Sequence, residues 1–82
     1  MLRYESGMLV RSLAGHDKGK LYIIIDEREK RIFLADGKIR TMQNPKVKKT
    51  IHVQLIKKKL EMQELTDYSI RSFIKNYQEE HL

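Results

Sequence analysis

The sequence predicts a small, mainly β domain: a barrel of about five strands followed by an amphipathic C-terminal helix. Two observations support this class. Short apolar stretches rich in β-branched residues alternate with glycine, proline and charged turns over residues 1–57, as expected for strands. Nearer the C-terminus the apolar period changes from two to 3.6, which is typical of a helix. The length of 82 residues is that of one domain with a modest core.

The first two strands are predicted at residues 7–14 and 20–26. Gly15 ends the first strand, and the second contains the consecutive isoleucines Ile23, Ile24 and Ile25. Both faces of the second strand are apolar. This pattern favours a strand that either curls inside a small barrel or is covered by another element.

The middle of the chain predicts a hairpin, a tight turn and an irregular edge. Charged residues 26–30 form the expected hairpin tip, and residues 31–36 the third strand. Asp36-Gly37 is a strong tight-turn signal, because both central positions of a type I′ turn need positive φ. A short fourth strand should follow at residues 38–40. Residues 41–50 contain Pro45, which indicates a loop or an irregular edge.

The C-terminal third predicts a fifth strand, a linker and the helix. Apolar and polar residues alternate over residues 51–56. Residues 57–65 are predicted to form a linker or a frayed extension. The helix should run from Asp67 to Gln78, with Thr66 as N-cap and Leu65 packing on Ile70 as a hydrophobic staple. Residues 1–57 would therefore form the barrel. Residues 58–82 would form the linker and a helix packed on or beside it.

The composition excludes several classes of protein. The chain has no cysteine, which rules out disulfides, thiolate zinc sites and thiol catalysis. Its longest apolar run is five residues, far short of the roughly 20 that span a bilayer. The N-terminus lacks the apolar core of a signal peptide. We therefore expect a cytoplasmic protein, monomeric and without membrane association.

Charge is distributed unevenly along the chain. Residues 1–60 hold 15 Lys/Arg against six Asp/Glu, a balance of +9, whereas residues 61–82 hold two against five, a balance of −3. Between Asp36 and Glu61 the sequence contains no acidic residue. A basic field of this kind attracts a polyanion. The alternative is a solvated surface that only keeps the protein soluble.

The turn at residues 15–20 is the first candidate site. Gly15 and Gly19 would let the backbone approach a phosphate closely, and Lys18 and Lys20 would neutralise it. The glycine spacing is too short for a nucleotide-binding loop, and a strand follows where a helix would be required. The alternative is a hairpin turn whose lysines face only water.

The second candidate site is the basic segment at residues 40–52. Its lysines surround the bend at Pro45, and an extended backbone would place several charges on one side. The alternative is an edge strand that lysines protect against aggregation. Because the chain has no RNP-type aromatic pair, recognition of shape and backbone is favoured over reading of bases. Tyr22 and Phe33 are expected to pack in the core, and the alternative is that one of them stacks on a base.

Catalysis and metal binding have little support. Ser12, His16 and Asp17 are close in sequence, but neighbouring residues on a turn diverge and should not form a relay. The three histidines lack metal-ligand spacing. We expect neither an enzyme nor a metal or other cofactor. The helix would either cover an open end of the barrel or dock on a protein partner.

One stretch resembles a known family. Leu9-Val10-x-Ser12-x-Ala14-Gly15-x-x-Lys18-Gly19-Lys20, followed by Ile23 to Ile25, resembles the KOW motif of ribosomal proteins and transcription elongation factors. The continuation, Phe33-Leu34-Ala35-Asp36-Gly37-Lys38-Ile39-Arg40, then Asn44-Pro45-Lys46-x-Lys48-Lys49 and His52-Val53, is similar to small stand-alone KOW proteins of the large ribosomal subunit. The resemblance covers about residues 6–57 and implies an SH3-like β-barrel.

The resemblance and the charge pattern together imply a protein that binds structured RNA, most simply ribosomal RNA, through backbone phosphates. The alternative is an adaptor that contacts ribosomal or transcription proteins. Charge reversal at Lys46, Lys48 and Lys49 should weaken RNA binding and leave the thermal midpoint nearly unchanged. The expected RNA contacts are Arg11, Gly15, His16, Lys18, Gly19, Lys20, Lys38, Arg40, Lys46, Lys48, Lys49 and His52.

Overall fold

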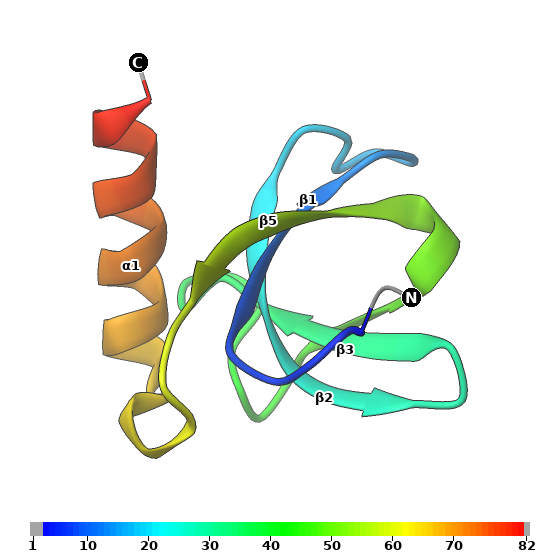
Figure 1. The fold of residues 1–82 in the computed structure, drawn as a ribbon, viewed down its shortest axis with the longest axis horizontal. Helices are drawn as coiled ribbons and strands as arrows, with labels where there is room; N and C mark the ends of the chain where they lie inside the picture. Colours follow the sequence, from blue (N-terminus) through cyan, green and yellow to red (C-terminus); the bar gives the residue numbers. More distant parts are fainter. Residues whose placement is uncertain (1–2, 82) are drawn as a thin grey trace.

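Five antiparallel strands form one curved sheet in the order β4-β3-β2-β1-β5, with a helix beside it (Figure 1). The structure is a computed structural model and describes residues 3–81. Its elements are β1 (Met8–Ser12), β2 (Leu21–Arg28), β3 (Arg31–Ala35), β4 (Lys46–Lys49), β5 (Val53–Lys59) and α1 (Asp67–Glu80), with 3₁₀ turns η1 (Thr50–His52) and η2 (Met62–Glu64). The predicted fold class is confirmed.

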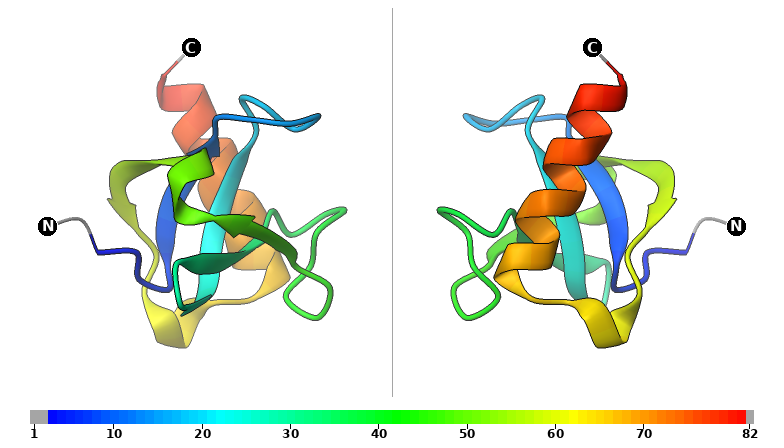
Figure 2. Two further views of the ribbon diagram at one scale, coloured as in Figure 1. Left: turned by 90° about the vertical axis from the view of Figure 1, so that its right-hand side faces the viewer. Right: turned by 90° about the vertical axis from the view of Figure 1, so that its left-hand side faces the viewer.

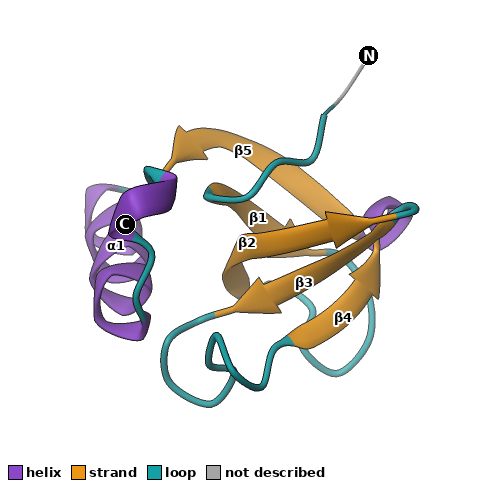
Figure 3. Ribbon diagram, turned by 90° about the horizontal axis from the view of Figure 1, so that it is seen from below, coloured by secondary structure: helices purple, strands orange, loops and turns teal. Residues whose placement is uncertain are grey.

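The barrel is open rather than closed. β4 and β5 are the two edges of the sheet, and within residues 3–81 no strand pairing joins them. Figure 3 shows them at opposite ends of the curved sheet, separated by the other three strands. Residues 1, 2 and 82, which the predicted domain boundaries include, lie outside the described residues. In the described part of the chain, no helix is both long and apolar enough to cross a membrane.

β2 is apolar on both faces because each face packs against a different partner. Tyr22 and Ile24 join a cluster on the inner face of the curved sheet, whereas Leu21 and Ile23 pack on the outer face. Ile70 and Ile74 of α1 complete the outer cluster. Both explanations offered by the sequence therefore apply, since the strand curls around a core and is also covered. The helix covers a sheet face, not an open end of a barrel.

The hairpin tip is shorter than predicted. Only Glu29 and Lys30 form the turn, with φ angles of 48° and 67°. Residues 26–28, predicted as part of the tip, instead extend β2 and pair with β3 as far as Arg28 opposite Arg31. A register shift between Ile24 and Asp26 accommodates the extra length.

The predicted fourth strand at residues 38–40 does not form. The Asp36 carboxylate accepts hydrogen bonds from the backbone N–H groups of Lys38 (2.9 Å) and Arg40 (3.0 Å). It thereby captures the donors that a strand would use in a ladder. Residues 36–45 form a loop instead, and the basic segment after Pro45 becomes the edge strand β4, paired with β3.

The last strand and the helix are shifted slightly from their predicted bounds. Residues 50–52 form a 3₁₀ turn, and β5 runs from Val53 into the predicted linker as far as Lys59. The predicted N-cap is confirmed: Thr66 Oγ1 accepts from the backbone N of Ser69 (3.0 Å), and Ser69 Oγ accepts from the backbone N of Thr66 (2.9 Å). This reciprocal pair is a capping box, and α1 continues two residues past the predicted end.

Candidate nucleic-acid interface

The loop at residues 13–20 folds back on the end of β1. The backbone N of Gly19 donates to Ser12 O (2.8 Å), and the backbone N of Ser12 donates to Lys20 O (2.9 Å). Gly15 and Gly19 have φ angles of +85° and +92°, which glycine adopts without steric cost. The two glycines predicted to shape this turn therefore do so.

A buried carboxylate organises the loop from inside. Asp17 is only 7% exposed and accepts hydrogen bonds from the hydroxyls of Ser12 (2.9 Å) and Tyr22 (2.8 Å). The ammonium groups of Lys48 and Lys46 lie 3.1 and 3.5 Å from its two oxygens. We call these five residues the Asp17 cluster.

The surroundings of Asp17 favour its ionised form. Burial alone would raise the pKa of this carboxyl, but the hydrogen bonds from Tyr22, Ser12 and Lys48 outweigh burial and hold the pKa well below its usual range. Burial and the hydrogen bond to Asp17 raise the pKa of Tyr22. Asp17 is therefore an internal anion that anchors the loop.

The Asp17 cluster was not predicted from the sequence. We expected Ser12 and Asp17 to diverge, yet their side chains are hydrogen-bonded. The available signal was a lone acid in a basic loop between two apolar strands. His16 remains exposed and takes no part in the cluster. Among residues 3–81, no three His, Asp or Glu side chains gather as metal ligands would.

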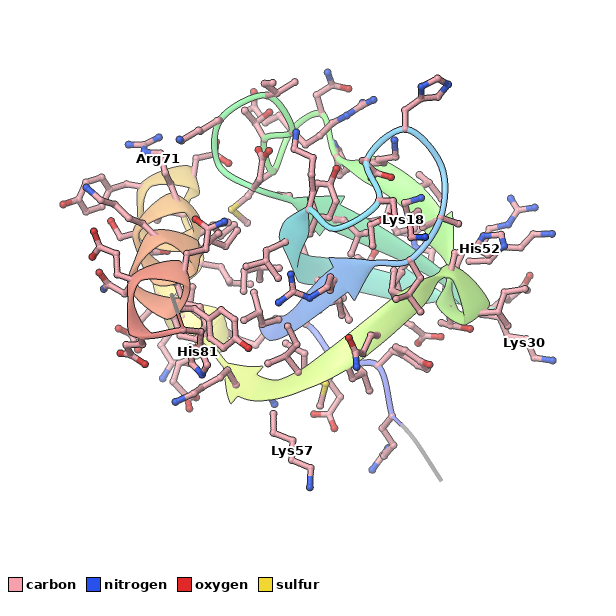
Figure 4. The ribbon with its side chains drawn as sticks, turned by 90° about the horizontal axis from the view of Figure 1, so that it is seen from above. Lys18, Lys30, His52, Lys57, Arg71 and His81 are labelled. Carbon is pink, nitrogen blue, oxygen red and sulfur yellow. The ribbon has the colours of Figure 1, made fainter. Side chains whose placement is uncertain are left out.

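The structure brings the two predicted basic segments together. Lys48 Nζ donates to the backbone O of Ala14 (3.0 Å), and the backbone N of Leu13 donates to His52 O (2.9 Å). The loop at residues 13–20 thus lies against β4 and η1, through contacts between residues 34 and 39 positions apart in the sequence. Figure 4 shows Lys18 and His52 on this part of the molecule, with Lys57 pointing elsewhere.

Alternation places Lys46 and Lys48 on one side of β4, as the sequence predicted, but Lys49 lies on the other side. Lys46 and Lys48 pair with Leu34 and Ile32 of β3 and reach Asp17, whereas Lys49 pairs with Arg31 on the opposite face. The Lys48 side chain is only 10% exposed and that of Lys46 28%. Lys48 is therefore a structural residue, because its ammonium is occupied by Asp17 and Ala14.

Apart from Arg11, the remaining predicted residues lie on two loops that project from the same side of the molecule (Figure 2). Lys18, Lys20 and Lys38 are exposed there. Arg40 is partly buried, and its backbone is bonded to Asp36. Arg11 lies on β1, where its guanidinium donates to Gly19 O (3.3 Å).

Arg28 and Arg31, which lie with Lys49 on the opposite face of the sheet, were not predicted from the sequence as site residues. Arg28, Arg31 and Lys49 occupy directly paired positions on three neighbouring strands. Like charges placed directly opposite one another destabilise a sheet. Among residues 3–81, only Arg28 of these three forms an ion pair, with Asp26 at 3.2 Å. Strand alternation would have found this row if the predicted hairpin tip had been two residues long.

Comparison with known proteins adds no assignment to this geometry. No protein-family model matches the chain, and a search of curated proteins found no match.

Proposed function

We propose that this protein is a KOW-like module that binds structured RNA, most simply ribosomal RNA, in the cytoplasm. It would recognise the fold of the RNA through backbone phosphates and act as a ribosomal protein or ribosome-associated factor. The proposal rests on charge, loop geometry and the sequence resemblance together.

The distribution of charge between the loop and β4 carries the proposal. Over residues 13–20 and 46–52 the sequence has one acidic residue, Asp17, and that carboxylate is buried and paired. The exposed ionisable side chains of these two segments are lysines and histidines, and the fold brings the two segments together. Such a surface presents positive charge to solvent with no competing anion, which favours a polyanion.

The residues of this surface would play different parts. Lys18 and Lys20 would contact phosphates, with Lys46 shared between Asp17 and the RNA. Lys49 would act with Arg31 on the opposite face of the edge strand β4, where an anion would relieve their mutual repulsion. Each phosphate contact releases counterions, so five contacts would give a log–log slope of affinity against salt of roughly −3 to −4.

Single charge reversals test the proposal. Lys18→Glu and Lys49→Glu should each weaken binding to a ribosomal RNA fragment by about fivefold or more, because each removes one counterion-releasing contact and adds a repulsive charge. Lys57→Glu makes the same change on a side chain that points away from Lys18 and His52 (Figure 4). Fluorescence anisotropy at two salt concentrations gives both the affinity and the salt slope.

Two outcomes would contradict the proposal. Equal losses in all three variants would indicate a general effect of net charge rather than a site. Binding to a ribosomal protein that is insensitive to salt, with no binding to RNA, would instead indicate an adaptor that uses the exposed apolar residues Val47 and Ile51.

A further inference from the structure

A groove runs between α1 and the two projecting loops. Its volume is about 760 Å³, which lies within the range of roughly 300–1,000 Å³ that is common for ligand sites. Four cations line it from three separate segments: Lys20 from the loop at residues 13–20, Lys38 from the loop at residues 36–45, and Arg71 and Lys75 from α1. We call it the helix groove.

The two walls of the helix groove are fixed to each other. Arg71 Nη1 donates to the backbone O of Gly37 (2.9 Å), and the Asp67 carboxylate accepts from the backbone N of Met42 (2.9 Å). Gly37 lies so close to α1 that a Cβ on it would overlap the backbone O of Asp67. Contacts within the fold therefore hold α1 and the loop at residues 36–45 together along the groove.

Positive charge dominates the helix groove. Its one acidic lining residue is Asp36, whose carboxylate already accepts two backbone N–H groups of its own loop. None of the ion pairs among residues 3–81 involves the four lining cations. The lining therefore has a net charge of +3 and suits a ligand that carries several negative charges.

Two large side chains stand exposed at the helix groove. Tyr68 is 71% exposed and Ile39 is 74% exposed. The Arg71 guanidinium lies over the Tyr68 ring, 5.6 Å from its centroid. An exposed aromatic ring beside a guanidinium is a platform on which an unpaired base stacks, and the neighbouring cations hold its phosphates.

We propose that the helix groove binds an unpaired RNA strand that flanks the structured RNA held by the loops. One base stacks on Tyr68, and Lys38 and Lys75 contact the backbone. The proposal rests on the proposed RNA-binding function, and Lys20 links the two surfaces because it belongs to both. The helix, which the resemblance to KOW proteins does not cover, thereby becomes part of the RNA-binding surface.

The experiment compares two RNAs that differ only in an unpaired end. One is a blunt hairpin from ribosomal RNA, and the other is the same hairpin with an extension of about six uridines, within the site sizes known for single strands. The wild-type protein should bind the extended RNA about tenfold more tightly, the gain expected for one stacked base with phosphate contacts. Anisotropy titrations with both RNAs measure this ratio.

Variants assign the gain to the groove. Tyr68→Ala and Lys75→Glu should each reduce the ratio to near one without changing affinity for the blunt hairpin. Tyr68→Phe keeps the ring and should keep the gain. Met62→Ala removes another exposed apolar side chain, Lys57→Glu makes a matched charge change, and neither should alter the ratio. Circular dichroism confirms that each variant is folded.

The outcomes separate this proposal from the one on which it rests. Equal wild-type affinity for both RNAs, or a gain that survives Tyr68→Ala and Lys75→Glu, would overturn the groove proposal and leave blunt-hairpin binding intact. Failure to bind either RNA would overturn both. The groove proposal would also be overturned if an acidic peptide bound the groove and the unpaired extension gave no increase in RNA affinity.

Discussion

Lys48 and Lys49 are neighbours in the sequence, yet their side chains leave β4 on opposite faces. Lys48 lies against the buried Asp17 carboxylate, and Lys49 lies beside Arg31 in solvent. Two identical side chains therefore have different effects on folding. The sequence suggested that reversing the charges of Lys46, Lys48 and Lys49 together would leave the thermal midpoint nearly unchanged. In the structure, this change would remove both cations, Lys46 and Lys48, that pair with the buried Asp17 carboxylate.

Replacing each lysine separately shows the difference. Lys48→Met should lower the free energy of unfolding by about 2–4 kcal/mol, because it leaves a buried charge without its closest cation. Lys49→Met should change it by less than about 0.5 kcal/mol, as is usual for an exposed position. Urea denaturation of the two variants measures both values. Equal effects would contradict the structural role of Lys48.

At the scale of elements, the sequence predicts best what is decided locally. The helix was placed correctly because Thr66, Ser69 and the apolar spacing act within a few residues. The prediction of a strand at residues 38–40 was wrong because the Asp36 side chain binds the backbone N–H groups of Lys38 and Arg40. For β4 the sequence left a loop and an irregular edge strand both open, because the pairing with β3 that decides between them is a tertiary contact.

Two glycines test the junction between the loops and the helix. Gly19 and Gly37 both have positive φ, but only Gly37 lies against α1, and a Cβ on Gly19 would meet nothing within 4 Å. Gly19→Ala should cost only about 1–2 kcal/mol of left-handed strain. Gly37→Ala should cost clearly more, because a clash with α1 is added to similar strain. Thermal unfolding of both variants gives the comparison, and matching midpoints would argue against the close contact.

At the scale of the whole molecule, the Asp17 cluster sets a pH window for stability. Below about pH 4 the carboxyl gains a proton in the unfolded chain, whereas the folded protein resists it because its pKa is held low. The unfolded state then binds more protons, so the free energy of unfolding falls as pH drops. Above about pH 10 the unfolded chain loses the Tyr22 proton that the folded state retains. Stability therefore falls again as pH rises.

Asp17→Asn isolates the acidic limb of this window. The variant should be less stable than the wild type by about 2–4 kcal/mol at pH 7, and the difference should shrink between pH 4 and pH 2 as the wild type loses its advantage. Denaturant titrations across this range measure the difference. A gap that stays constant with pH would show that Asp17 does not keep a lowered pKa in the folded protein.

The sequence predicted only the local part of the candidate site, because contacts between residues far apart in the sequence leave no local pattern. Lys18, Lys20 and the glycines were found because a turn is a local object with its own residue types. The helix groove forms only where α1, Gly37 and Lys20 come together in the folded chain. Because these residues are far apart in the sequence, no local sequence pattern predicts the groove. The role of Lys48 likewise depends on Asp17, which lies 31 positions away in the sequence.

The hydrogen bonds and ion pairs that hold the loop at residues 13–20 affect the rate and the selectivity with which this loop would bind a partner. Asp17 is held by four other side chains, and the backbone N–H groups of Gly19 and Lys20 are hydrogen-bonded within the fold. The conformational entropy of this loop is therefore lost when the chain folds, before any partner arrives. If the loop binds RNA as proposed, this loss of entropy in advance would favour an RNA whose phosphates already match the loop, because any other partner would require the loop to rearrange.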